Sequence, residues 1–180
     1  SLNLDLNRIS VSKTGSYNDE GMEVLAGALK FNKTLTYISL RSNLIEAEGV
    51  IPLSKALIVN ETLTSIDMGD NDIGSEGAKF LAKALAVNET LTSINIQYND
   101  IGNEGAKELA KALAVNETLT SLNIQYNDIG DEGAKQLAKS LRFNVSLTFL
   151  DIAHNINIGT EGEHELIKVL EKNTKLNLYL

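Results

Sequence analysis

Hydrophobic and polar positions along this chain follow a pattern that recurs every 28 residues. The repeated string has the form apolar-x-x-apolar-x-apolar-x-x-Asn, as in LTSINIQYN and LTSLNIQYN. Its complete copies begin at Leu35, Leu63, Leu91, Leu119 and Leu147. A fixed period of this length with this pattern predicts a solenoid, in which similar units stack along one axis.

Two different periodicities follow one another within each unit. In LTSINIQYN, Ile94 and Ile96 point to one side and their neighbours to the other, which is the period of a short, half-buried strand. In NEGAKELAKALAVN, Ala106, Leu109 and Leu113 recur with helical spacing and form one apolar stripe. The pattern therefore predicts an α/β protein in which short strands and helices alternate.

A single unit buries too little apolar surface to fold alone. About six buried aliphatic side chains contribute roughly 1.5–3 kcal/mol each, whereas ordering the backbone costs roughly 1–2 kcal/mol for every residue. Stacked units share their apolar faces, so we expect one continuous domain over residues 1–180. It comprises a partial first repeat (1–34), full repeats at 35–62, 63–90, 91–118, 119–146 and 147–175, and a partial strand (176–180).

Polar residues mark the expected ends of the helices. Side-chain oxygens that precede a Glu-Gly pair can cap a helix N-terminus, and they belong to Asp19, Ser75, Asn103, Asp131 and Thr160. We expect helices to end at residues in the left-handed conformation, which are Asn32, Asn60, Asn88, Asn116 and Asn144. The same asparagines form N-x-[ST] sequences that resemble glycan acceptor sites. Because these sequences recur with the repeat period, we interpret them as structural.

Three segments depart from the regular pattern. Pro52 should make the second helix start late or bend, because proline lacks a backbone donor. Extra residues between Ile9 and Glu20 should form a protruding loop, and one extra residue between Asn155 and Gly159 should form a bulge. Surface loops accept such insertions at low cost.

These signals together resemble the leucine-rich repeat family, in its ribonuclease-inhibitor-like subfamily with long helical repeats. The resemblance rests on the LxxLxL strand, the G-A-x-x-L-A-x-A-L helix and a row of asparagines, which are Asn43, Asn71, Asn99, Asn127 and Asn155. The chain is also similar to the repeats of NOD-like receptors and of many leucine-rich proteins in protists and intracellular bacteria. The resemblance implies a horseshoe segment whose parallel strands line a concave face and whose helices cover the convex face.

The acidic composition limits the classes of partner. The formal net charge is −8 and the pI is near 4.8, which argues against nucleic acid and anionic membrane surfaces and favours a basic protein partner. The sequence has no cysteine, no apolar run long enough for a membrane span and no signal-peptide pattern. We expect a cytoplasmic protein, or one delivered into a host cytoplasm. We also expect end-to-end self-association through the apolar residues Leu2, Leu4 and Leu178 of the incomplete repeats.

Residues suited to catalysis are few. His154 and His164 are the only histidines, and without cysteine they suggest neither a zinc site nor a cysteine nucleophile. Asp67 and Asp151 occupy equivalent strand positions three repeats apart. At about 4.8 Å per strand they are separated by roughly 14 Å, too far for a carboxylate pair. We therefore expect no enzymatic activity and no catalytic, cofactor-binding or metal-binding residues.

The outward positions of successive strands form columns of amide, tyrosine and carboxylate side chains, which suit protein recognition. We expect Tyr98 and Tyr126 to form the centre of one aromatic patch that Phe149 and His154 extend. The predicted partner-binding residues are Tyr37, Asp67, Asp70, Asn95, Gln97, Tyr98, Asn123, Gln125, Tyr126, Phe149, Asp151 and His154.

The sequence thus favours a protein–protein interaction module that binds a protein partner through its concave face, as part of a longer receptor, regulator or effector. Two alternatives stay open. A structural spacer or assembly segment would use the fold without the columns. A GTPase-activating segment is suggested by a resemblance to the repeats of Ran GTPase-activating proteins, with Arg8 and Arg41 near the strand edges.

Overall fold

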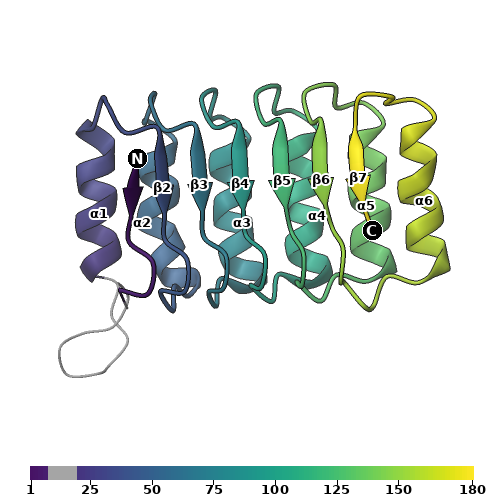
Figure 1. Cartoon of the computed structure of the whole chain (residues 1–180), viewed down its shortest axis with the longest axis horizontal. Coiled ribbons are helices and arrows are strands. Elements are labelled where there is room, and N and C mark those ends of the chain that lie inside the picture. The colour runs from purple at the N-terminus through teal and green to yellow at the C-terminus, as the bar shows by residue number, and fades with distance from the viewer. Residues whose placement is uncertain (8–19) are drawn as a thin grey trace.

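Strands and helices alternate along the whole described chain, as the sequence pattern predicted. The computed structural model describes residues 1–7 and 20–180, and these residues form seven strands and six helices (Figure 1). The loop predicted between Ile9 and Glu20 falls mainly on residues 8–19 and so lies outside the described residues. Arg8 and the predicted cap Asp19 lie outside them as well.

Each strand is short, and a helix follows each strand from β1 to β6. The strands are β1 (Leu2–Asn3), β2 (Tyr37–Ser39), β3 (Ser65–Asp67), β4 (Ser93–Asn95), β5 (Ser121–Asn123), β6 (Phe149–Asp151) and β7 (Asn177–Tyr179). The helices are α1 (Glu20–Phe31), α2 (Ala47–Leu57), α3 (Gly74–Leu85), α4 (Gly102–Leu113), α5 (Asp131–Leu141) and α6 (Thr160–Leu170).

One parallel sheet contains all the described strands, in the order of the chain. The register does not slip between units, since Ile38 pairs with Ile66 and Ile66 pairs with Ile94. The helices form a second layer behind the sheet, and no other described element covers its front (Figure 1). We call this uncovered side of the sheet the open face. The arrangement is that of a solenoid.

The core lies between the sheet and the helices. Ile94 and Ile96 of one strand segment and Leu109 of α4 are buried, as the pattern predicted. Neighbouring helices approach closely, because a Cβ atom at Gly105 in α4 would lie 3.0 Å from the Cβ atom of Ala78 in α3. Small residues at these positions let successive units share one continuous core.

A ladder of buried asparagines joins the units at the turns that follow the strands. Asn99 is 1% exposed, and its amide nitrogen donates to the carbonyl oxygens of Met68 (2.9 Å) and Gln97 (3.0 Å). Its amide oxygen accepts a hydrogen bond from the backbone N–H of Ile73 (3.3 Å). Met68 and Ile73 belong to the preceding unit, so each asparagine satisfies buried backbone groups of two units at once.

A second asparagine ladder lies where the helices lead into the strands. Asn88 is buried, and its amide nitrogen donates to the carbonyl oxygen of Leu57 (2.7 Å) in α2. Its amide oxygen accepts from the N–H groups of Thr90 (3.0 Å) and Leu91 (2.7 Å). Asn60, Asn116 and Asn144 make equivalent bonds.

These bonds correct one expectation and explain the N-x-[ST] sequences. None of the five helix-ending asparagines has a positive φ, so the prediction that they form left-handed caps is wrong. The polypeptide turns instead around an amide side chain that bonds forward to its own strand and backward to the previous helix. The threonine of the sequence contributes as well, since the hydroxyl of Thr90 donates to the carbonyl oxygen of Asn60 (3.1 Å).

The predicted N-terminal caps also act differently from expectation. Helices α3 and α4 begin at Gly74 and Gly102, so the predicted caps Ser75 and Asn103 lie inside them. The residues that do precede helices α2 to α6 make no side-chain capping bond. Asn103 instead caps the next helix along the solenoid, because its Oδ1 accepts from Gly130 N and Gly133 N (both 2.9 Å). Asp131 does the same for α6. The caps therefore join neighbouring units.

The remaining irregularities leave the strand register intact. Pro52 lies inside α2 and does not set its start, because α5 begins at the equivalent residue without a proline. The extra residue between Asn155 and Gly159 leaves Ile156 exposed and delays the start of α6. The sheet absorbs this change before β7, since Leu150 still pairs with Leu178.

Replacing Asn99 with Ala should lower the free energy of unfolding by about 1–3 kcal/mol, because buried backbone groups lose their partners. Urea denaturation followed by circular dichroism measures this change. Asn157→Ala is the matched control, since Asn157 is exposed and makes no side-chain hydrogen bond within the described residues. Its effect should stay within about 0.5 kcal/mol. Equal stability of the Asn99 variant and the parent would contradict the proposed role of the ladder.

Candidate interaction surface

The parallel register brings most of the predicted site residues together on the open face. Asp67, Asn95, Asn123 and Asp151 occupy one row across β3, β4, β5 and β6, since each pairs with the next. Ser121 pairs with Phe149 in a second row. The side chains of these residues are half-buried. The columns deduced from the sequence are therefore rows of neighbouring side chains in the structure.

The first of these rows has a structural role that the sequence analysis missed. Asp67 Oδ1 accepts from Gly69 N (2.8 Å), and Asn95 Oδ1 accepts from Gln97 N (3.1 Å). Asn123 makes the equivalent bond to Gln125 N. Asp and Asn side chains commonly bond the backbone two residues ahead, which starts a turn. One oxygen of each residue therefore holds the chain where it leaves the strand.

A network of polar side chains crosses the open face from β2 to β6. We assign Gln97 the amide orientation in which its oxygen accepts from both terminal nitrogens of Arg41 and its nitrogen donates to Gln125 Oε1 (3.0 Å). Gln125 Nε2 then donates to Asp151 Oδ2 (2.7 Å). A cation thus lies at one end of the network and a carboxylate at the other.

Gly69 makes this network sterically feasible. Arg41 starts beside β2 and must pass over the unit of β3 to reach Gln97. A Cβ atom at Gly69 would lie 2.6 Å from Arg41 Nη1 and 3.2 Å from Gln97 Cγ. Arg41, Gly69 and Gln97 occupy equivalent positions in three successive units. The glycine between the two longer side chains is the sequence feature that could have predicted their contact.

Three aromatic rings stack at the edge of the sheet where the strands end. The ring centroids of Tyr98 and Tyr126 are 4.1 Å apart with planes inclined by 9°, and those of Tyr126 and His154 are 4.4 Å apart and inclined by 15°. All three residues have positive φ, between 51° and 61°. Such backbone is unfavourable for bulky residues, and the ring contacts contribute favourable energy to the same turns.

The predicted single aromatic patch is divided in two by the structure. Phe149 begins β6, whereas His154 follows the end of that strand. They are five positions apart, and backbone of that length spans at most roughly 16 Å. Phe149 instead contacts Tyr179 of β7, with ring centroids 5.3 Å apart. Tyr179 was missed, although it pairs with Asp151 in the register of the rows.

Hydrogen bonding and charge affect the outer end of the stack. The pKa of Tyr98 is raised above 10.0, chiefly by its hydrogen bond with the Tyr126 side chain and then by desolvation. Asp70 lies near Tyr98 and opposes its ionisation, while Arg41 favours it. Ser42 Oγ donates to Asp70 Oδ2 (2.6 Å) and holds this carboxylate beside the stack.

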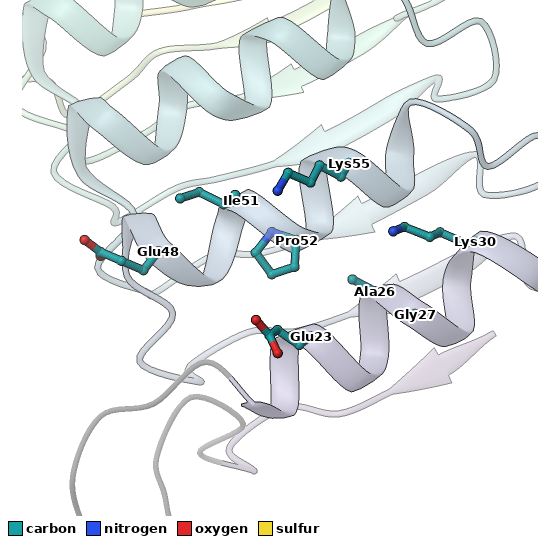
Figure 2. A pocket seen from close by; sticks show the side chains of 8 residues that line it. All are labelled: Glu23, Ala26, Gly27, Lys30, Glu48, Ile51, Pro52 and Lys55. Atoms are coloured by element: carbon teal, nitrogen blue, oxygen red, sulfur yellow. The ribbon is translucent and has the colours of Figure 1, made fainter.

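A separate groove of about 470 Å³ lies on the helical side, between α1 and α2. Figure 2 shows Glu23 and Glu48 toward one end and Lys30 and Lys55 toward the other, with Pro52 between the helices. The carboxylates lie in first turns and the lysines in last turns, where these charges suit the helix dipoles. The groove contains none of the predicted site residues.

The chemical groups of the described residues do not converge on a reaction centre. Asp67 and Asp151 lie on β3 and β6 with two strands between them. His154 is part of the aromatic stack, and His164 lies in α6. Within residues 1–7 and 20–180, no three His, Asp or Glu side chains are grouped to hold a metal ion. No helix there is long and apolar enough to span a bilayer.

Tyr126→Phe should lower the pKa of Tyr98 toward 10.0, because phenylalanine preserves the ring stack but removes the hydroxyl that raises this pKa. Tyr98 therefore stays protonated to higher pH in the parent than in the variant. An NMR titration of isotope-labelled tyrosine measures the difference. Tyr37→Phe is the control, since Tyr37 lies on β2 away from the stack. An unchanged Tyr98 titration in Tyr126→Phe would show that the hydroxyls do not interact.

Solved structures of other proteins share this architecture. Leiomodin-1 actin-binding site 2 has a TM-score of 0.70 and 24% identity, over 83% of this chain and 87% of that one. The tropomodulin C-terminal domain of Caenorhabditis elegans has a TM-score of 0.71 and 16% identity, over 86% and 93%. The leucine-rich repeat-containing protein LegL7 from Legionella pneumophila has a TM-score of 0.60 and 21% identity, over 98% of this chain and 53% of LegL7. At these identities the likeness shows the fold.

Sequence comparison identifies the repeat itself. None of the curated proteins compared with the chain matches it. The family model described as Leucine Rich repeat matches residues 31–54, 59–82, 87–110 and 115–138, which together exceed half of the chain. Each matched segment contains one of the strands β2 to β5 and its asparagine of the strand-end ladder. The chain therefore belongs to the leucine-rich repeat family.

Proposed function

We propose that this leucine-rich repeat domain is a protein–protein interaction module, without enzymatic activity, that binds a protein partner through the open face. The observation that carries the proposal is the preformed network of Arg41, Gln97, Gln125 and Asp151. The long helical repeats further support assignment to the ribonuclease-inhibitor-like subfamily. A longer receptor, regulator or effector is the natural setting for such a module.

Preformed order makes the open face suitable for binding. Association costs about 0.5–1.5 kcal/mol for each flexible side chain that becomes fixed. The network already holds Arg41, Gln97 and Gln125 before a partner arrives, and stacking holds Tyr98 and Tyr126. Tyrosine and arginine are also the side chains that protein interfaces favour.

The structure changes how the proposed binding residues are grouped. The central group is the polar network, which includes Asp151, together with the neighbouring Asp67, Asn95 and Asn123. The aromatic stack, with Asp70, forms the group at the strand ends, and Tyr37 and Phe149 form the group at the strand starts. The proposed partner-binding residues are Tyr37, Asp67, Asp70, Asn95, Gln97, Tyr98, Asn123, Gln125, Tyr126, Phe149, Asp151 and His154.

Carboxylates around the open face support a basic partner. Asp67 and Asp151 lie in the first row described above, and Asp70 lies beside the aromatic stack. The chain as a whole has a formal net charge of −8. Complementary charge accelerates association and makes it sensitive to salt. Independently of charge, actin is one protein to include among candidate partners, because the leiomodin-1 structure is named for binding it.

The two alternatives make different demands on the same residues. A GTPase-activating segment would need an arginine free to enter a partner's site, whereas Arg41 is bonded to Gln97 across the sheet. Arg8 lies outside the described residues. A spacer would need only the core and the ladders, so substitutions on the open face would leave its function intact.

A variant with Tyr98→Ala, Tyr126→Ala and Phe149→Ala should lose partner binding, because each aromatic anchor contributes about 2 kcal/mol or more at a binding hot spot. A pull-down from a host lysate with parent and variant measures the loss, and circular dichroism confirms that the variant is folded. The matched control replaces Lys79, Lys107 and Lys135 on the helical side with Ala and should retain binding.

Loss of binding in the lysine variant, with binding retained in the aromatic variant, would place the binding surface on the helices. Retention of every captured protein by both variants would support the spacer alternative. Accelerated GTP hydrolysis by a small GTPase in the presence of the parent, lost on Arg41→Ala, would support the GTPase-activating alternative.

A further inference from the structure

A row of exposed apolar side chains runs along the edge of the solenoid where the helices lead into the strands. This edge is the upper one in Figure 1 and is separate from the open face. We call these residues the apolar row, and they are Phe31, Val59, Val87, Val115 and Phe143. Their exposed fractions lie between 51% and 84%. The sequence analysis did not single them out.

The fold does not account for the apolar character of this row. The neighbouring asparagines, such as Asn88 and Asn116, hold the loops through buried hydrogen bonds, while the row itself faces solvent. The residues that precede the row differ in chemistry, being Lys30, Ile58, Ala86, Ala114 and Arg142. An apolar side chain thus recurs at this position in all five units, although only the surroundings of Phe31, Val59 and Phe143 differ in sequence from those of Val87 and Val115. Contiguous exposed apolar residues of this kind mark interaction surfaces.

Carboxylates lie beside the middle of the apolar row. Glu61, Glu89 and Glu117 each follow a row residue by two positions. Glu61 pairs with Lys33 (3.4 Å), whereas neither Glu89 nor Glu117 forms an ion pair with any residue in the described part of the chain. The middle of the edge therefore presents unpaired negative charge next to apolar surface.

The two unpaired carboxylates line the same depression. It lies between the loops that follow α3 and α4, has a volume of about 310 Å³, and is also lined by Val87 and Val115. Lysine and arginine place their aliphatic stems on apolar surface and keep the charged group in contact with water or carboxylates. A basic side chain could rest its stem on the two valines and bring its charge to Glu89 and Glu117.

We propose that this edge binds an extended segment of another protein in which basic side chains occupy alternate positions and so share the side turned toward the edge. Neighbouring strands are separated by about 4.8 Å and neighbouring helices by about 8–10 Å, and the edge lies between the two layers. Alternate residues of an extended chain are about 6.8 Å apart. That distance falls within the range, so successive basic side chains of a segment running along the solenoid can reach Glu89 and Glu117 in turn.

Charges at the two ends of the edge restrict the site to its middle. Lys30 lies at the end formed by α1, where the neighbouring Lys33 is already paired with Glu61. The depression at the other end is lined by Arg142, Lys172 and Lys175. A basic segment is therefore favoured beside Glu89 and Glu117 and disfavoured beyond them.

Fluorescence anisotropy with a short labelled peptide that alternates lysine and leucine tests the proposal. The parent chain should bind this peptide and should not bind a peptide that alternates glutamate and leucine. Glu89→Gln with Glu117→Gln should weaken binding about fivefold, as expected for the loss of two exposed charge pairs. Val87→Ser with Val115→Ser should weaken it about tenfold through lost apolar contact.

The matched control is Asp100→Asn with Asp128→Asn. It removes the same amount of charge from exposed residues at the opposite edge, in turns whose positive φ asparagine tolerates. Binding should stay within about twofold of the parent because the control leaves the proposed contacts in place. The open-face variant with Tyr98→Ala, Tyr126→Ala and Phe149→Ala should also retain it.

Several results would overturn the proposal. Equal weakening by the two charge-removing pairs would show general attraction to an acidic protein. Loss of binding only in the open-face variant would move the peptide to that face. Failure of the parent to bind the lysine peptide, or equal binding of the glutamate peptide, would remove the basis for a basic partner segment at this edge.

Discussion

Hydrogen bonds from asparagine side chains to the backbone of the neighbouring unit hold this solenoid together. Each turn after a strand contains buried peptide groups that the parallel sheet leaves without partners. Asn127 accepts from Asn99 N (3.1 Å) and Ile101 N (3.3 Å) and donates to the carbonyl oxygen of Ile96 (2.9 Å). An amide suits this position because one side chain supplies both donors and an acceptor. An apolar side chain of similar size would leave the turn groups buried and unpaired.

The two ladders also account for the surfaces. Because one is placed before each of the strands β2 to β6 and the other after it, both ends of these strands are fixed relative to the neighbouring unit. Equivalent residues therefore fall side by side, and a side-chain type that recurs in the sequence becomes a continuous row in space. The polar network, the aromatic stack and the apolar row are three such rows, on two different sides of the repeat. Even the extra residue near Ile156 does not disturb them, since β6 and β7 keep their register.

The sequence was sufficient to predict the fold and the rows but not the contacts made between units. Periodicity identifies what is buried and what repeats, so the positions of Ile94, Leu109 and Asn99 followed directly. It does not show how far a side chain reaches. Asn103 lies where a helix cap belongs, yet its oxygen bonds the next helix, because the solenoid brings that helix start within reach. The path of Arg41 over Gly69 depends on the same kind of cross-unit contact.

The aromatic groups illustrate the limit for the candidate site. A single column placed Tyr98, Tyr126 and His154 together, and the stack follows from that column. Whether Phe149 belongs to the same patch depends on its distance along the chain from His154 as well as on the distance between strands. Phe149 lies at the start of β6 and contacts Tyr179, whereas His154 follows the end of that strand and stacks on Tyr126. A strand rises by about 3.3 Å per residue, so side chains on the same strand can belong to different groups. Column membership is thus the dependable part of a repeat sequence, and position along the strand must be considered separately.

The residues that form the core and the ladders differ from those that form the two surfaces, and this affects how the domain can recognise partners. The ladders and the core determine the spacing of the repeat units. The open face and the apolar row contribute little to the ladders or the core, so each surface can differ in sequence without altering the fold. In a solenoid, the contacts that form the core are confined to neighbouring units. The open face and the helix-to-strand edge also lie on different sides of every unit. A partner on one surface would therefore leave the other accessible.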